Sequence, residues 1–180
     1  MPALAEGDRP TLLLVPEGVA PGAIEGFAGE APGAAPVRRG NLRIARIPFV
    51  SQDDYDRLLR LADLNFVRGE DSWIRAHWAR RSFVWQPYRQ EEFAHRVKLA
   101  AFLERLRAAA LAPPSCEAAA VGAIEAMMRA WSGDGDPARA WRDLERQAEA
   151  AAVAFRRWTD SLLAQPDLAS RLARWAADRL

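Results

Sequence analysis

The chain has 180 residues, half of them hydrophobic, with 25 basic and 24 acidic side chains and a formal net charge of +1. This length and apolar content predict one folded domain, and the near-zero charge gives no electrostatic reason to expect a nucleic acid or a membrane as partner. A single cysteine, Cys116, excludes an intrachain disulfide framework and a cysteine cluster for zinc.

The early apolar run over residues 12–15 is too short for a signal peptide or a membrane span, so we expect a cytoplasmic protein. Strands and helices then alternate along the first 111 residues. The expected elements are a strand over 11–15 buried on both faces, a weakly supported helix over 19–30, a loop over 31–40, a strand over 41–47, a helix capped by Ser51, a strand over 64–67, a helix over 72–80, a strand over 82–85 and a helix over 90–111. This alternation predicts an α/β fold with a mostly parallel sheet flanked by helices.

After Pro113 and Pro114 the pattern is helical only, with helices expected over 117–131, from Pro137 onward behind an Asp136 cap, and over 168–180. Large apolar residues recur with spacings of three and four over residues 141–162. This seam fits either a coiled coil with a partner helix or one long helix packed on its own sheet, and we favour the second interpretation.

Ligands of open α/β sheets bind at the carboxyl ends of the strands, which here carry Phe49, Gln52, Tyr88, two carboxylates, a hydroxyl and two arginines. The segment Arg68–Gly69–Glu70–Asp71–Ser72 joins a strand to a helix N-terminus, which is a favourable seat for phosphate. The alternative is an ordinary turn in which Asp71 or Ser72 only caps the helix.

Other familiar motifs are absent, including the glycine-rich dinucleotide and P-loop fingerprints. His77 and His95 lie on different expected helices without metal-ligand spacing, so we expect both to be structural. Trp73, Trp78 and Trp85 are expected in the core, and Cys116 is expected to be a small buried residue. These features predict no metal site.

Two blocks carry a family resemblance: residues 47–56, IPFVSQDDYD, and residues 63–72, DLNFVRGEDS. Together with residues 12–18, 83–86, Tyr88, His95, 98–103 and 166–168, they resemble the EarP family. Members of this family are bacterial protein-arginine rhamnosyltransferases that modify translation elongation factor P. The likeness runs along essentially the whole chain.

The resemblance implies the C-terminal, Rossmann-like donor-binding domain of a GT-B glycosyltransferase, with dTDP-β-L-rhamnose as donor and no cofactor or metal. It implies that Phe49 and Gln52 lie near the thymine, Tyr88 at the donor site and Glu70 at the deoxyribose. Asp71 and Ser72 match the diphosphate turn. The implied reaction inverts the anomeric centre, with an arginine of elongation factor P as nucleophile.

Family members are about twice as long, and the chain resembles only their C-terminal half, beginning after the first strand of that domain. The N-terminal half is implied to carry the general base, so no catalytic residue is expected among these residues. We therefore expect a nucleotide-sugar-binding core over 1–112 and helices over 113–180 packed on it. A separate N-terminal chain is a candidate partner.

Two other functions compete with a donor-binding half. The first is a non-catalytic interaction module, which predicts no nucleotide affinity and an exposed seam over residues 141–162. The second is another nucleotide-sugar enzyme such as an epimerase, against which the lack of a suitable acidic or histidine pair counts.

Overall fold

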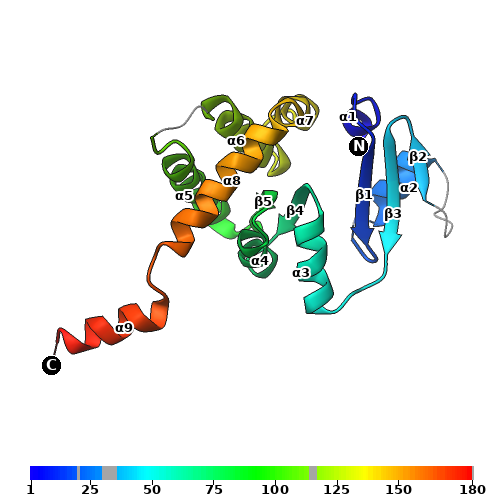
Figure 1. The fold of residues 1–180 in the computed structure, drawn as a ribbon. Coiled ribbons are helices and arrows are strands. Elements are labelled where there is room, and N and C mark those ends of the chain that lie inside the picture. The colour runs from blue at the N-terminus through cyan, green and yellow to red at the C-terminus, as the bar shows by residue number, and fades with distance from the viewer. Residues whose placement is uncertain (20, 30–35, 114–116, 180) are drawn as a thin grey trace.

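The computed structural model describes residues 1–19, 21–29, 36–113 and 117–179 (Figure 1). Its elements in chain order are α1 (Pro2–Ala5), β1 (Thr11–Pro16), α2 (Pro21–Ala28), β2 (Val37–Arg39), β3 (Leu42–Ile47), α3 (Gln52–Leu61), β4 (Leu64–Arg68), α4 (Asp71–Ala79), β5 (Ser82–Gln86), a 3₁₀ turn (Glu91–Phe93), α5 (Ala94–Ala110), α6 (Ala118–Trp131), α7 (Pro137–Arg146), α8 (Ala148–Leu163) and α9 (Leu168–Ala177).

The strands form parallel pairs connected by helices, which confirms the expected α/β class. β1 pairs with β3 and β4 pairs with β5, both in parallel, while the short β2 adds to β3 in the antiparallel direction. The strands form two sheets, one with the order β1-β3-β2 and the other with β4-β5. The β3–α3–β4 segment connects the two sheets (Figure 1).

The larger hydrophobic core lies around β4 and β5 and is closed by the helices of the second half of the chain. Its largest fully buried side chains are those of Phe83, Val84, Leu103, Leu106, Val121, Ile124, Met128 and Phe155. Helices α6 and α8 both contact β5, and α8 also packs along α5. The helical C-terminal segment therefore contributes directly to the core beneath the β4-β5 sheet.

A second, smaller core belongs to the β1-β3-β2 sheet. Val15, Ile24, Leu42 and Ile44 form it, and α1 and α2 contribute apolar side chains on the same face. The expectation that β1 is buried on both faces is wrong. Leu12 and Leu14 are 56% and 41% exposed because helices cover only the face that carries Val15.

The seam over residues 141–162 is part of the core and not an open surface for a partner helix. Leu144, Ala151, Phe155 and Trp158 are buried in the larger core. One continuous helix, however, is not what forms there. The chain breaks between α7 and α8 at Gln147, whose ψ of 13° is not helical, so that α7 packs on α6 while α8 packs on α5.

Three further boundaries differ from expectation. Residues 2–5 form the short helix α1, and residues 37–39 form β2 within the expected loop. Helix α5 begins at Ala94 because Glu92 and Phe93 adopt left-handed φ values of 57° and 59°. Cys116 lies outside the described residues.

Two caps agree with expectation. The Ser51 hydroxyl accepts a hydrogen bond from Asp54 N at 3.2 Å, and the Asp136 carboxylate accepts from Ala138 N at 2.9 Å, directly before Pro137. The last helix, α9, has no buried residue and extends away from the body of the molecule (Figure 1).

A matched pair of substitutions tests where the core lies. Leu103→Ala removes a side chain that is 1% exposed, and we expect it to lower the free energy of unfolding by about 2–5 kcal/mol. Leu172→Ala on α9 removes the same atoms from a side chain that is 55% exposed, so a change within about 0.5 kcal/mol is expected. Urea unfolding of both variants measures the difference, and equal losses would contradict this core.

Candidate functional site

The turn between β4 and α4 is built around Gly69. Its φ of 75° is left-handed, and its N–H donates to Gln86 O at 3.0 Å. Its carbonyl accepts a hydrogen bond from the Trp85 indole Nε1 at 2.7 Å. Both polar backbone groups of Gly69 are therefore bound to β5, which fixes the turn to the sheet.

A layer of aromatic side chains supports this turn from below. Trp85 is 2% exposed and stacks on Trp73 with ring centroids 4.4 Å apart and an interplanar angle of 16°. Phe102 of α5 meets Trp85 edge to face at 5.6 Å. The turn thus rests on a tightly packed part of the core and is held in one position.

Among the residues that the structure describes, none caps the N-terminus of α4 with its side chain. Glu70 occupies the N-cap position without accepting a cap hydrogen bond, and the Ser72 hydroxyl instead donates to Arg68 O at 2.6 Å. Because a helix leaves its first N–H groups without partners in the helix, those of the first turn of α4 stay available to a ligand. The expectation that Asp71 or Ser72 caps this helix through its side chain is therefore wrong, because neither side chain makes the cap hydrogen bond.

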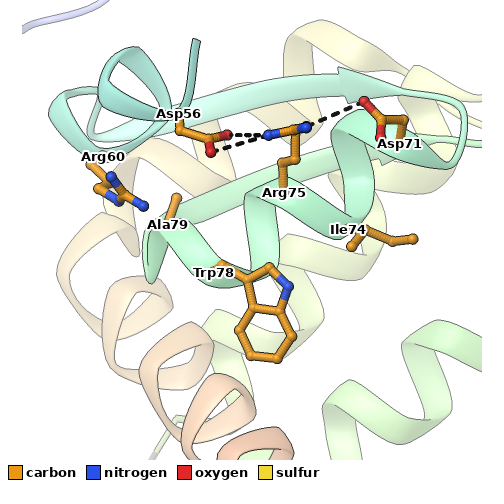
Figure 2. A pocket seen from close by; sticks show the side chains of 7 residues that line it. All are labelled: Asp56, Arg60, Asp71, Ile74, Arg75, Trp78 and Ala79. Atoms are coloured by element: carbon orange, nitrogen blue, oxygen red, sulfur yellow. Dashed lines mark hydrogen bonds and ion pairs between the residues drawn. The ribbon is translucent and has the colours of Figure 1, made fainter. Parts of the chain in front are cut away.

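Both carboxylates at the turn face cations. Glu70 pairs with Lys98 of α5 at 3.4 Å, and Asp71 accepts from Arg75 Nε at 3.3 Å. Arg75 also holds both oxygens of Asp56 at 3.1 Å, and Figure 2 shows its guanidinium lying between the two aspartates. Arg75 therefore joins α3 to α4 and draws the Asp71 carboxylate toward the flank of the helix.

A pocket of about 240 Å³ lies along this flank, between α3 and α4. Its lining residues, shown in Figure 2, are Asp56, Arg60, Asp71, Ile74, Arg75, Trp78 and Ala79. Only Asp71 belongs to the residues that the sequence analysis places at the donor site. The pocket is therefore a neighbour of the turn and not the space above it.

Tyr88 lies directly over the turn. A Cβ placed on Gly69 would come within 2.3 Å of the Tyr88 ring, so the missing side chain leaves room for this close contact. The guanidinium of Arg68 lies over the Tyr88 ring, with its Cζ 5.3 Å from the ring centroid, which is within the range of a cation–π contact. Tyr88 is 52% exposed, so it still presents surface to a ligand.

Arg68 is a residue for which the sequence analysis gave no specific role. None of the ion pairs among the described residues involves Arg68, so its positive charge is not neutralised by an acid there. The signal in the sequence was its position at the last residue of a strand, directly before the glycine of the turn. The structure adds the direction of the side chain, toward Tyr88.

Phe49 and Gln52 come from the other sheet, at the carboxyl end of β3. Phe49 is 90% exposed and Gln52 is an exposed residue at the start of α3. Within the described residues, no hydrogen bond or ring contact links either of them to Glu70, Asp71, Ser72 or Tyr88. The structure therefore groups four of the six predicted site residues and leaves Phe49 and Gln52 apart.

A contact between helices relates the two groups. The Tyr55 phenol of α3 lies near Ser72 of α4, and burial is the main cause of the raised pKa of Tyr55. The Arg75–Asp56 pair holds α3 against α4. The loop that carries Phe49 and Gln52 leads into α3, so these contacts connect it to the turn.

The histidines have structural partners, as expected. His77 is buried, which lowers its pKa, and its Nδ1 lies 2.6 Å from Trp73 O. His95 Nδ1 accepts from Gln90 N at 3.3 Å. Trp78, in contrast, is 52% exposed and is not a core residue as expected, because it lies on the outer side of α4 at the pocket.

Among the described residues, no group of three histidine, cysteine or acidic side chains is arranged to hold a metal ion. In the same part of the chain, none of the helices has the length and apolar character required to cross a membrane.

Comparison with known proteins gives one consistent family. The family model described as elongation-factor P (EF-P) rhamnosyltransferase EarP matches residues 1–177. The chain belongs to the EarP family. Curated EarP relatives named protein-arginine rhamnosyltransferase include those of Pseudomonas aeruginosa, at 44% identity over 98% of this chain, and Pseudomonas putida, at 41% over 99%.

A solved structure is also similar, and all of these likenesses cover only part of the longer proteins. A chain from work on the structural basis for EarP-mediated arginine glycosylation of translation elongation factor EF-P superposes with a TM-score of 0.81 at 37% identity, covering 99% of this chain and 55% of that one. The chain covers 46% of each of the two Pseudomonas relatives. It therefore spans about half the length of the EarP proteins that it matches.

The contact between Gly69 and Tyr88 can be tested with two glycine substitutions. Gly69→Ala places a Cβ against the Tyr88 ring at a left-handed φ, and we expect it to lower the free energy of unfolding by about 1–3 kcal/mol. Gly122→Ala in α6 meets no atom within 4 Å and should instead raise stability by up to about 1 kcal/mol. Thermal unfolding compares the two, and an unaffected Gly69→Ala variant would disprove the close contact.

Proposed function

We propose that this chain is the donor-binding half of a protein-arginine rhamnosyltransferase with the GT-B fold, and that it takes dTDP-β-L-rhamnose. The observation that carries the proposal is the uncapped N-terminus of α4, which follows a glycine turn fixed to β5. Family membership supports rhamnosyl transfer as the reaction to which this binding site contributes.

The diphosphate of the donor would lie over the first turn of α4. The backbone N–H groups of this turn and the positive end of the helix dipole favour an anion there. Arg68 adds a charge close to the same turn, while Arg75 draws the Asp71 carboxylate aside. This division of charge removes the repulsion that two free carboxylates would exert on a diphosphate, and it needs no metal ion.

Glu70 suits a hydroxyl of the deoxyribose. Its carboxylate is half exposed, and its pairing with Lys98 at 3.4 Å is loose enough to leave acceptor capacity on its oxygens. The Ser72 hydroxyl, now donated to Arg68 O, is close enough to the helix N-terminus to turn to a phosphate oxygen. Phe49 and Tyr88 supply exposed aromatic faces and Gln52 an amide for the thymine.

In the proposed reaction, an arginine guanidine nitrogen of elongation factor P attacks the anomeric carbon of rhamnose. The bond from this carbon to the diphosphate oxygen breaks, so the anomeric centre is inverted and dTDP leaves. The helix N-terminus and Arg68 would stabilise the negative charge that grows on the diphosphate. The proton lost by the guanidine goes to a base from the half of the EarP protein that this chain does not span.

The proposal places both donor and acceptor in the cytoplasm, where elongation factor P works, and it names no nucleic acid or membrane as partner. The competing interaction module requires an exposed seam over residues 141–162, and that seam is instead packed in the larger core. The donor-binding half is therefore the function that the site supports best.

Calorimetric titration of the chain with dTDP tests the donor site. We expect saturable binding, weaker binding of UDP, and an affinity for dTDP reduced about 10- to 100-fold in Glu70→Ala, because one hydrogen bond to a charged group is lost. Glu104→Ala removes another exposed glutamate, on α5, and should leave the affinity unchanged. A folded chain that binds no dTDP would refute the proposal.

A second substitution tests the contact between Arg68 and the diphosphate. Arg68→Gln should lower the affinity for dTDP about tenfold while leaving the affinity for thymidine, which has no phosphate, unchanged. Raising the salt concentration should weaken dTDP binding less in the variant than in the unmodified chain. Arg105→Gln, an exposed arginine of α5, is the matched control, and an equal loss for thymidine would show that Arg68 acts on the nucleoside instead.

A further inference from the structure

Glu70 of the turn is paired with the only lysine of the chain. Of the 25 basic residues all but Lys98 are arginines, and the Lys98 Nζ lies 3.4 Å from Glu70 Oε1. Among the described residues, neither partner takes part in a second ion pair. The side chains are about half exposed, at 45% for Lys98 and 51% for Glu70, so a ligand can reach the pair.

The core determines where the two partners stand. Phe102 lies one helical turn after Lys98 on α5 and meets Trp85 edge to face at 5.6 Å. The Trp85 indole donates to Gly69 O at 2.7 Å, and Gly69 directly precedes Glu70. The contacts therefore form a closed path from Glu70 through the turn, Trp85 and α5 back to Lys98. One aromatic layer fixes the backbone of both partners.

A neighbouring ion pair shows what is particular about a lysine in this position. Arg75 holds both carboxylate oxygens of Asp56, each at 3.1 Å. Lys98 contacts one oxygen of Glu70, and Oε2 has no hydrogen-bond partner among the described residues. The difference follows from the groups, because a guanidinium matches a carboxylate with two parallel N–H donors whereas an ammonium is a point charge. Glu70 therefore keeps one oxygen open to a ligand.

One open oxygen suits a sugar with one hydroxyl at this position. A ribose presents neighbouring 2′- and 3′-hydroxyls, and a carboxylate binds such a pair with one oxygen for each hydroxyl. With Lys98 on Oε1, a ribose must displace the ammonium or leave its 2′-hydroxyl without an acceptor, and both outcomes weaken binding. A 2′-deoxyribose has only the 3′-hydroxyl to place, so Oε2 is sufficient for it.

We propose that Lys98, through its contact with Oε1 of Glu70, makes the donor site selective for a 2′-deoxyribose over a ribose. This inference rests on the proposed function, which assigns Glu70 to the sugar of the donor nucleotide. Lys98 is a positioning residue, since it holds the Glu70 carboxylate and touches no reacting atom. An ordinary surface ion pair would contribute little free energy and would not distinguish two sugars.

Two nucleotides that differ only in the 2′-hydroxyl test the selectivity. Calorimetric titration of the chain with dTDP and with 5-methyluridine 5′-diphosphate should show dTDP binding at least about tenfold more tightly. Lys98→Met keeps a long side chain without its charge and should reduce this ratio to about threefold or less, because a ribose can then use both oxygens of Glu70. A ratio near one in the unmodified chain, or a ratio that Lys98→Met leaves unchanged, would overturn the inference.

This ratio separates selectivity from a loss of structure. A variant that is merely less well folded loses affinity for both nucleotides equally, so its ratio stays as in the unmodified chain. Arg105→Met removes another exposed cation of α5 and is the matched control, with no expected change in the ratio. The ratio of dTDP to dUDP, which differ only in the methyl group of the base, should be the same with and without Lys98. A change there would show an effect on the base and count against the inference.

A double substitution tests whether Lys98 acts through Glu70. In Glu70→Ala the ratio of the two sugars should already be near one, and adding Lys98→Met should leave it there, because the two residues act as a unit. Competition against a labelled dTDP measures the weakened affinities. A further change of the ratio in the double variant would show that Lys98 contacts the sugar directly, and this would refute the positioning role.

The conservative variant Lys98→Arg separates the number of occupied oxygens from the charge. A guanidinium at this position should hold both oxygens of Glu70, as Arg75 holds those of Asp56, and lower the affinity for dTDP about tenfold although the charge is kept. Full affinity for dTDP in Lys98→Arg would contradict the role of the single open oxygen. A folded chain that binds neither nucleotide refutes the donor site itself, whereas binding of both with one ratio in all variants refutes only the role of Lys98.

Discussion

The two hydrogen bonds of Gly69 to β5 are the constraint on which the candidate site depends. They hold the backbone of the turn against the strand, while the Trp85 indole that makes one of them is locked by Trp73 and Phe102. A binding site gains affinity when its groups need no reordering, and this turn is ordered before any ligand arrives. The core around β4 and β5 therefore both stabilises the fold and positions the N-terminus of α4.

Much of this arrangement follows from the sequence because local rules act there without competition. Period-two and period-3.6 patterns and the caps at Ser51 and Asp136 place most elements within two residues. The break at Gln147 could not be predicted because no glycine or proline marks it in the sequence. It arises because α7 and α8 pack on different helices. The sequence also could not predict the exposure of Leu12, Leu14 and Trp78. An apolar side chain suggests burial, but it does not show whether another element is present to cover it.

For the site, the sequence predicts residue types and their edge of the sheet, and the structure adds direction. The sequence predicts that Asp71 lies at the ligand, but in the structure its carboxylate forms an ion pair with Arg75. The importance of Arg68 becomes visible only in the structure, where its guanidinium lies over the Tyr88 ring. Such side-chain directions depend on α3 and α5, which are distant in sequence from the turn. Arg75 follows Asp71 at the i,i+4 spacing of a helical ion pair, but no local pattern around residues 68–72 encodes Lys98 as the partner of Glu70.

The divided sheet connects fold and function. A parallel strand is most stable when both of its edges and both of its faces are occupied. Among the described residues, β1 pairs with β3 along one edge only, and the face that carries Leu12 and Leu14 is exposed. Phe49 and Gln52 follow β3 of the first sheet, whereas Glu70 belongs to the turn after β4 and Tyr88 follows β5 of the second sheet. The exposed leucines of β1 and the separation of Phe49 from Tyr88 both follow the division of the described strands into two sheets. The turn, the N-terminus of α4 and their charges all lie on the β4-β5 side of this division, where the larger core holds them in place.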